Sequence, residues 1–137
     1  MLNGVLVFGR NGGYGFGLIN FVKDQAYSYW DATGYTIYNG GISQRNSGAS
    51  TGGYNGSGIV NATVNDVAMT VLPNAPIDSA TGLPTPTIAV ATDAGVSVIK
   101  DDGNVWDIYA SNDIYDKTKY VRFDGEYLYY SAYNTQV

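Results

Sequence analysis

The sequence contains no cysteine and no histidine among its 137 residues. The absence of Cys excludes disulfides, thiol nucleophiles and zinc–thiolate sites, and the absence of His removes the commonest general base and metal ligand. Charge is also scarce, since only 14% of the residues are charged, with 7 basic and 12 acidic side chains. A net charge of −5 provides no basic footprint for binding nucleic acid through its phosphates. Composition therefore argues against most catalytic chemistry and against a nucleic-acid partner.

Long apolar runs are missing too. No stretch approaches the roughly 20 apolar residues that a membrane helix requires, so we expect no membrane partner. The segment Met1–Arg10 lacks the basic start and long apolar core of a signal peptide, and is typical of a strand that begins close to the initiator. Helical periodicity is confined to Ile19–Trp30, where aromatic residues favour a strand instead.

The residues that are present predict β-structure. Hydrophobic residues make up 45% of the chain and aromatic residues 14%, which suits one compact domain with a core. Short runs of Val, Ile, Thr, Tyr and Phe alternate with Gly, Asn and Asp clusters, and the Asp-Gly pairs supply the positive φ of tight hairpin turns. The sequence therefore predicts an all-β, antiparallel protein with strands near Val5–Gly9, Phe16–Val22, Ala26–Trp30, Tyr35–Tyr38, Ile59–Leu72 (interrupted), Thr87–Thr92, Val96–Lys100, Val105–Tyr109, Tyr120–Phe123 and Tyr127–Ser131.

Two segments interrupt this alternation of short strands and turns. Residues 39–58 are rich in Gly, Ser, Asn and Thr, which predicts a flexible surface loop or one ordered by a partner. Residues 73–86 hold all four prolines of the chain, which excludes a central strand and predicts a long extended connection.

A weak internal repeat is visible. Residues 87–108 form three predicted strands joined by two tight turns, residues 5–30 show a similar pattern, and residues 120–131 begin it again. The spacing between the second and third of these copies is about 40 residues, the period of a four-stranded propeller blade.

The run PTIAVATDAGVSVIKDDGNVWDI, from Pro86 to Ile108, carries a family resemblance. A strand that ends in a small-residue AT-D-x-G turn, followed by GVSVI and an Asp-Gly-Asn turn, resembles the blades of β-propeller repeats in phage virion or tail proteins and bacterial surface proteins. This resemblance implies a propeller fold, a scaffold or interaction role, and a place on a virion or extracellular surface. It implies no catalytic residue.

The predicted strands make two to three blades, whereas a closed propeller needs at least four. We divide the chain into a partial blade at 1–38, an inserted loop at 39–58, a full blade at 59–109 with the proline-rich connection 73–86, and the start of a further blade at 110–137. We favour a fragment of a longer ring; subunits that complete each other, or a small β-sandwich, are the alternatives. An incomplete ring exposes sheet edges and apolar faces, so we expect the remaining blades of the parent protein or self-association as partners.

Candidates for chemistry are few. Asp101, Asp102 and Asp107 resemble calcium ligands, but their spacing suits an acidic hairpin turn better. Asp124 and Glu126 could form a glycosidase carboxylate pair, yet an Asp-Gly turn explains Asp124. The Gly-rich stretch 9–17 is followed by no helix that could hold a phosphate. We therefore predict no catalytic residue, no metal site and no cofactor.

Aromatic side chains provide the better candidates. Tyr and Trp flanked by Asn and Asp stack on sugars or anchor protein interfaces, and the strands beside the inserted loop carry five of them. Our candidate ligand-binding residues are Tyr27, Tyr29, Trp30, Tyr35 and Tyr38. Structural roles in the sheet are the competing explanation for each of them.

These observations favour a non-enzymatic structural or adhesive β-propeller segment of a larger virion or surface protein. A lectin-like carbohydrate-binding module is the first alternative. The second is part of a propeller-type carbohydrate-active enzyme.

Overall fold

The computed structural model describes residues 1–10, 12–31, 34–39, 50–53, 58–109 and 116–134, and this part of the chain is all-β. Every strand pair is antiparallel, and consecutive strands are neighbours within each sheet. Within these residues there is no helix with the length and hydrophobicity needed to cross a membrane.

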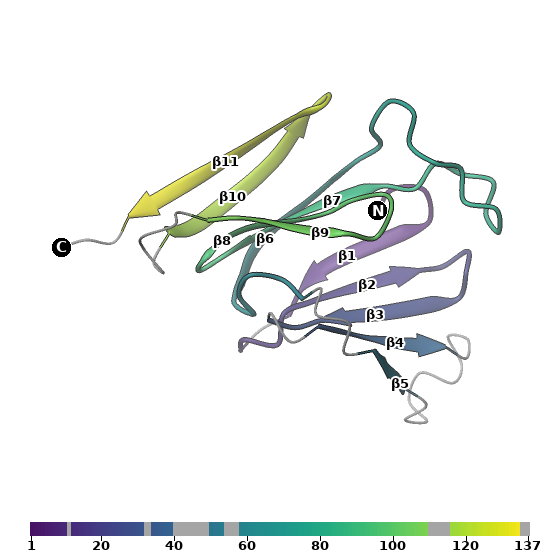
Figure 1. Cartoon of the computed structure of the whole chain (residues 1–137), viewed down its shortest axis with the longest axis horizontal. Coiled ribbons are helices and arrows are strands. Elements are labelled where there is room, and N and C mark those ends of the chain that lie inside the picture. The colour runs from purple at the N-terminus through teal and green to yellow at the C-terminus, as the bar shows by residue number, and fades with distance from the viewer. Residues whose placement is uncertain (11, 32–33, 40–49, 54–57, 110–115, 135–137) are drawn as a thin grey trace.

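The strands form two larger sheets and one hairpin (Figure 1). The first sheet contains β1 (Val5–Gly9), β2 (Phe16–Asn20), β3 (Gln25–Tyr29), β4 (Tyr35–Asn39) and β5 (Ser50–Gly53). The second sheet contains β6 (Val64–Thr70), β7 (Thr87–Thr92), β8 (Gly95–Ile99) and β9 (Val105–Ile108). The hairpin consists of β10 (Asp116–Asp124) and β11 (Tyr127–Asn134).

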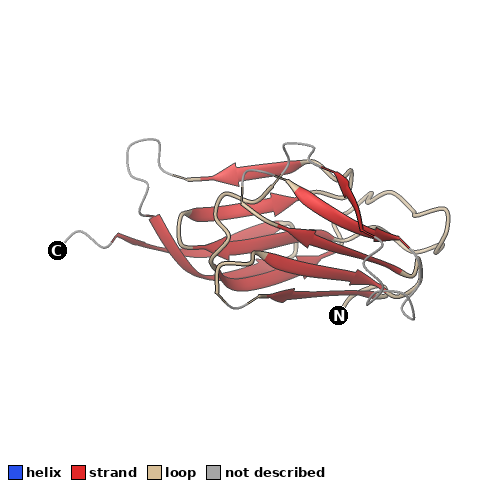
Figure 2. Cartoon of the chain, turned by 90° about the horizontal axis from the view of Figure 1, so that it is seen from below, coloured by secondary structure: helices blue, strands red, loops and turns tan. Residues whose placement is uncertain are grey.

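The second sheet is the middle layer of the molecule. On one side Ile88, Val90 and Ile99 pack against Phe16 and Tyr29 of the first sheet. Side chains of β7 alternate between the two faces, so Ala89 and Ala91 point the other way and pack, with Val96, against Val121 of the hairpin. The strands of these layers run broadly along the long axis of the molecule (Figure 2).

Residues 58–63 lead from the first sheet to β6, and their backbone connects the first two layers. The Ile59 N–H donates to the Trp30 carbonyl at 2.9 Å, and the Gly15 N–H donates to the Ala62 carbonyl at 2.8 Å. A Cβ on Gly58 would lie 1.7 Å from the Asp31 carbonyl oxygen, so only glycine allows this close approach. Because this segment is used for crossing, the strand expected over 59–72 starts only at Val64.

Polar side chains of the second sheet hold the hairpin in place. Asp66 accepts a hydrogen bond from the Val121 N–H at 3.1 Å, and the Asn65 amide donates to the Thr118 carbonyl at 2.8 Å. Lys117 forms a 2.6 Å ion pair with Asp93 in the β7–β8 turn. These contacts fix β10 beside β6.

The predicted strand pattern is confirmed in most places, and the differences are local. β5 lies inside the segment expected to be a loop, where it pairs with β4; residues 40–49 and 54–57 of that segment lie outside the described residues. β10 begins at Asp116, earlier than the expected Tyr120. The connection 73–86 contains only an isolated bridge between Ile77 and Pro84, as its prolines predict.

The all-β, antiparallel fold is therefore confirmed, while the described strands form stacked sheets and no closed ring. The two stretches compared as repeats do not occupy equivalent places. β1 is the edge strand of the first sheet, whereas β7 is the second strand of its own sheet, with β6 outside it. The pattern shared by 5–30 and 87–108 is thus shifted by one strand between the two sheets.

Candidate functional site

A cleft opens between the first two layers at the end of the molecule that carries the β2–β3 turn and the proline-rich connection. Its volume is about 350 Å³. One wall is the inner face of the first sheet, and the other is formed by the connection and the β8–β9 turn. Among its lining residues are Leu18, Asn20, Lys23, Tyr27, Tyr29, Tyr35, Asp78, Pro84 and Asp101.

Three tyrosines form the apolar wall of this cleft. Tyr29 pairs directly with Tyr35, and Tyr27 lies two residues before Tyr29, so strand alternation places all three on one face. The ring centroids of Tyr29 and Tyr35 are 5.2 Å apart, and those of Tyr27 and Tyr35 are 6.1 Å apart. Tyr29 is buried against Phe16, and this burial raises the pKa of its hydroxyl well above the ordinary value. Tyr27 and Tyr35 remain partly accessible from the cleft.

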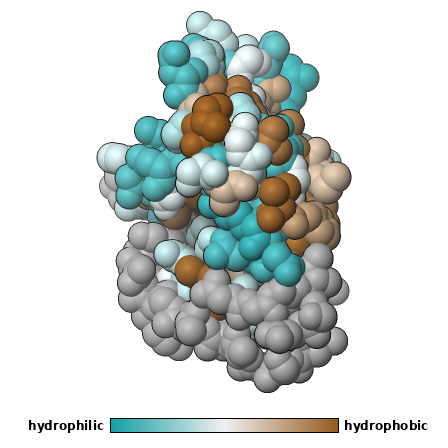
Figure 3. Space-filling view, turned by 90° about the vertical axis from the view of Figure 1, so that its right-hand side faces the viewer, coloured by the Kyte–Doolittle hydropathy of each residue, from teal (hydrophilic) through white to brown (hydrophobic). Residues whose placement is uncertain are grey.

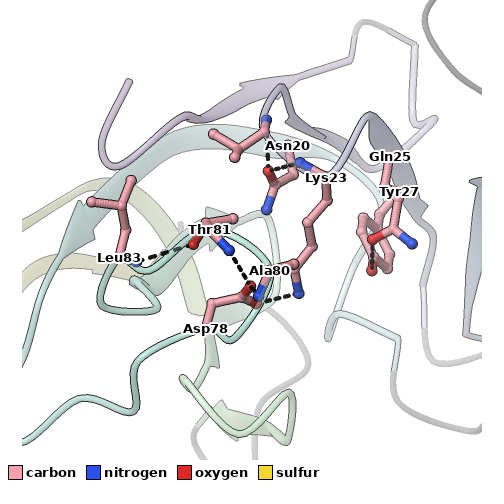
Figure 4. Close-up of polar contacts among 9 residues, drawn as sticks. Asn20, Lys23, Gln25, Tyr27, Asp78, Ala80, Thr81 and Leu83 are labelled. Atoms are coloured by element: carbon pink, nitrogen blue, oxygen red, sulfur yellow. Dashed lines mark hydrogen bonds and ion pairs between the residues drawn. The ribbon is translucent and has the colours of Figure 1, made fainter.

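An ion pair between Lys23 and Asp78 joins the two walls (Figure 4). Lys23 comes from the β2–β3 turn, which the Asn20 side chain caps by accepting the N–H of Lys23 at 2.9 Å. Asp78 is fixed in the same way by accepting the N–H of Ala80 at 2.9 Å. The hydrogen bond from Lys23 lowers the pKa of the Asp78 carboxyl, and the Ala80 N–H adds to this effect. Burial of Tyr27 raises the pKa of its hydroxyl, although Lys23 opposes that shift.

The other two aromatic candidates lie outside the cleft lining. Tyr38 pairs with Ala26, on the opposite face of the sheet from Tyr27. Trp30 follows β3 and is 42% exposed. The structure therefore brings together Tyr27, Tyr29 and Tyr35 and separates Trp30 and Tyr38 from them. Because side chains alternate between the two faces along a strand, the sequence could have indicated this division.

The outward face of the first sheet is a second surface of interest. A hollow of about 410 Å³ there is lined by Phe8, Ile19, Ala26 and Tyr38 with Arg10 at its side. The Phe8 ring lies over Gly17, where an added Cβ would come within 2.5 Å of it, so glycine leaves the space that the ring occupies. This apolar face has no layer over it among the described residues.

Apolar side chains are also exposed at the end where the cleft opens. Viewed from that end, hydrophobic and hydrophilic patches lie side by side (Figure 3). The exposed hydrophobic residues of the β2–β3 turn and the connection include Phe21, Val22, Ile77 and Leu83.

Two of the acidic candidates, Asp102 and Asp107, serve as local hydrogen-bond acceptors. Asp102 accepts the backbone N–H and side-chain amide of Asn104, both at 2.9 Å, which lowers the pKa of its carboxyl. Asp107 accepts the Ser97 hydroxyl at 2.6 Å. Asp124 ends β10 and Glu126 lies in the exposed turn after it. Across the described part of the chain, no three acidic side chains are grouped to hold a metal ion.

Two features were missed from the sequence. The Lys23–Asp78 pair joins residues far apart along the chain, and no local pattern indicates it. The exposed side of β9, with Trp106 at 64% and Ile108 at 39% exposure, was passed over because Val105–Ile108 has the pattern of an ordinary strand.

No model of a protein family, no curated protein and no solved structure matches this chain.

Proposed function

We propose that the protein is a structural or adhesive module of blade-like sheets, which functions by packing further sheets against its exposed apolar faces. The observation that carries this proposal is apolar surface that no other described residue covers, in two places. One is the outward face of the first sheet, around Phe8 and Tyr38. The other is the exposed side of β9, at the edge of the second sheet, with Trp106 and Ile108.

The way the layers stack supports the same proposal. Each sheet is a simple meander, and the first strands of successive sheets lie beside each other, β1 near β6 and β6 near β10. That arrangement suits a series of propeller blades, in agreement with the resemblance of residues 86–108 to blades of phage virion and bacterial surface proteins. Exposed sheet faces of this kind mark interaction surfaces.

Solution mass and dye binding test this proposal. The isolated chain is expected to associate at micromolar concentration and to enhance the fluorescence of a dye specific for apolar surface. Replacing Phe8 on the outward face with Ser should reduce both signals, while Thr36→Ser, on the same face, serves as the matched control. A monodisperse monomer that binds no dye would contradict the proposal.

A second candidate function rests on the cleft. Tyr27 and Tyr35 line the cleft together with Lys23 and Asp78, and such a combination of aromatic and charged side chains suits a saccharide ring. A glycan array would show binding that Tyr35→Ala abolishes and Tyr38→Ala, on the opposite face, leaves intact. If the chain binds no glycan on the array, the carbohydrate-binding function is contradicted and the structural role is unaffected.

A further inference from the structure

The cleft between the first two layers contains more acidic than basic side chains. Its charged lining residues are Lys23, Lys100, Asp78, Asp101 and Asp102. Two positive and three negative charges leave one negative charge in excess. A cleft whose lining is charged in this way attracts a positively charged ligand.

Each of the two lysines has a carboxylate beside it. Lys23 forms the ion pair with Asp78 that joins the two walls of the cleft (Figure 4). Hydrogen bonds from Asn104 are the main cause of the lowered pKa of the Asp102 carboxyl, and the nearby charge of Lys100 contributes to it. Both lysine charges are therefore balanced within the cleft, and the carboxylate in excess is that of Asp101.

The β8–β9 turn does not depend on the Asp101 side chain. The Lys100 N–H donates to the Asn104 carbonyl at 2.9 Å, and the Gly103 N–H donates to the Lys100 carbonyl at 2.9 Å. Across the described residues, the Asp101 carboxylate accepts no hydrogen bond and forms no ion pair, although the residue is partly buried. A partly desolvated carboxylate is stabilised by a cation that donates a hydrogen bond to it.

The wall formed by the first sheet offers a second kind of contact to a cation. Tyr27 and Tyr35 are partly accessible there, with ring centroids 6.1 Å apart. The face of an aromatic ring is negative, so it attracts an ammonium group as well as offering a flat apolar surface. Ring faces together with one unbalanced carboxylate suit a ring-shaped ligand that carries a positive charge.

The size of the cleft limits what it can hold. Its volume of about 350 Å³ is near the lower end of the range for small-molecule sites, about 300–1,000 Å³. The proline-rich connection bounds the cleft and is attached to the first sheet, since the Asn3 amide donates to the Pro84 carbonyl at 2.8 Å. The cleft therefore has room for a small ligand or for one unit of a longer chain.

We propose that the cleft binds an amino sugar, with the ammonium group at the Asp101 carboxylate and the sugar ring against Tyr27 and Tyr35. This inference rests on the carbohydrate-binding function proposed for the cleft, and it names the class of saccharide. An ammonium group has three N–H donors and supplies the positive charge that Asp101 lacks. An N-acetylated amino sugar has lost that charge, and a neutral sugar has a hydroxyl in its place. Preference for the free amine therefore distinguishes this ligand from other saccharides.

Titration of the full chain with three matched disaccharides, followed by NMR, tests the proposal. Disaccharides of glucosamine, N-acetylglucosamine and glucose with the same linkage differ only in the substituent at the second carbon. At about pH 6 a carboxyl is ionised and an amine is protonated. The glucosamine disaccharide should then bind roughly tenfold more tightly than the other two, because only it makes a charge-assisted hydrogen bond. Asp101→Asn should abolish this preference.

Asp124→Asn is the matched control for the charge of the protein. The chain has a net charge of −5, so a cationic sugar is attracted weakly to its whole surface. Asp124 ends β10 outside the cleft, and its substitution removes the same single charge. The preference for the amine should persist in Asp124→Asn. Equal loss of the preference in both variants would show general attraction to the surface and would overturn the proposal.

Three further results would overturn the proposal, and they separate its failure from that of the underlying function. Equal affinity for all three disaccharides would contradict the amino sugar and leave the carbohydrate-binding function intact. Ethanolamine is an amine without a sugar ring, and if it binds as tightly as the glucosamine disaccharide, the cleft takes simple organic cations and both proposals fail. Binding of none of the disaccharides would also contradict both. The structural role is judged separately by Phe8→Ser.

Discussion

β7 and β9 belong to the same sheet, but they have opposite environments. All six residues of β7 are buried, whereas three of the four residues of β9 are exposed. Both strands direct apolar side chains toward the hairpin side of the sheet, Ala89 and Ala91 from β7 and Trp106 and Ile108 from β9. In the second sheet, burial of a side chain therefore depends on whether the hairpin covers it and not on the hydrophobicity of its strand.

The largest expected effect comes from truncating one isoleucine in each strand. Ile88→Ala removes a side chain that is 3% exposed and should lower the free energy of unfolding by about 3 kcal/mol through lost burial and a cavity. Ile108→Ala should cost less than about 1 kcal/mol, because much of that side chain already contacts water. Urea unfolding of both variants measures the contrast, and equal losses would mean that β9 is covered in solution.

A smaller effect is expected where the start of β8 lies beside the end of β9. Gly95 has a φ of +130°, and a Cβ there would lie 2.4 Å from the Ile108 carbonyl oxygen. Gly95→Ala should therefore lower stability by about 2 kcal/mol or more, since it combines backbone strain with a clash. Gly103 also has a positive φ, at +84°, but nothing lies within 4 Å of its Cβ position. Gly103→Ala should cost about 1 kcal/mol, and urea unfolding of the two glycine variants measures the difference.

The smallest effect concerns the attachment of the hairpin. Partial burial tends to raise the pKa of the Asp93 carboxyl, but hydrogen bonds from Lys117 and Asn65 outweigh it and leave the pKa below its ordinary value. Because the pKa is lowered on folding, the stabilisation is complete above the unfolded pKa of about 4 and is lost as the pH falls through the folded value. The contribution of this partly exposed pair should stay below about 1 kcal/mol.

Asp93→Asn isolates that contribution from the other carboxyls. Between about pH 5 and pH 2, the free energy of unfolding should fall less in the variant than in the unmodified chain. Asp124→Asn, at the exposed tip of the hairpin, also removes one carboxyl but lies outside this ion pair, and it is the matched control. An identical profile for Asp93→Asn would show that its ion pair does not hold the hairpin.

Much of this fold could be predicted because its signals are local. Runs of β-branched and aromatic residues mark the strands, and Gly95 and Gly125 adopt the positive φ that their turns require. β5 was missed because Ser50–Gly53 has no strand propensity of its own and depends on pairing with β4.

The candidate site was predictable only in part. Alternation correctly groups Tyr27 with Tyr29, but their apposition to Tyr35 depends on the register of the β3–β4 hairpin. The Lys23–Asp78 pair and the exposure of β9 depend on how separate layers meet, which strand patterns do not encode.

Residue-resolved hydrogen exchange of the isolated chain tests the central claim most directly, because it reports which backbone amides lack a partner. We expect the Val90 amide to be strongly protected and the Tyr129 amide, paired toward Arg122, to be protected for as long as the hairpin stays formed. The Leu128 and Tyr130 amides point to the edge of β11 that no other described strand covers, because inward and outward amides alternate along the hairpin. They should exchange at rates close to those of an unstructured chain. Protection of Leu128 and Tyr130 equal to that of Tyr129 would show that the edge is already covered and would contradict the account.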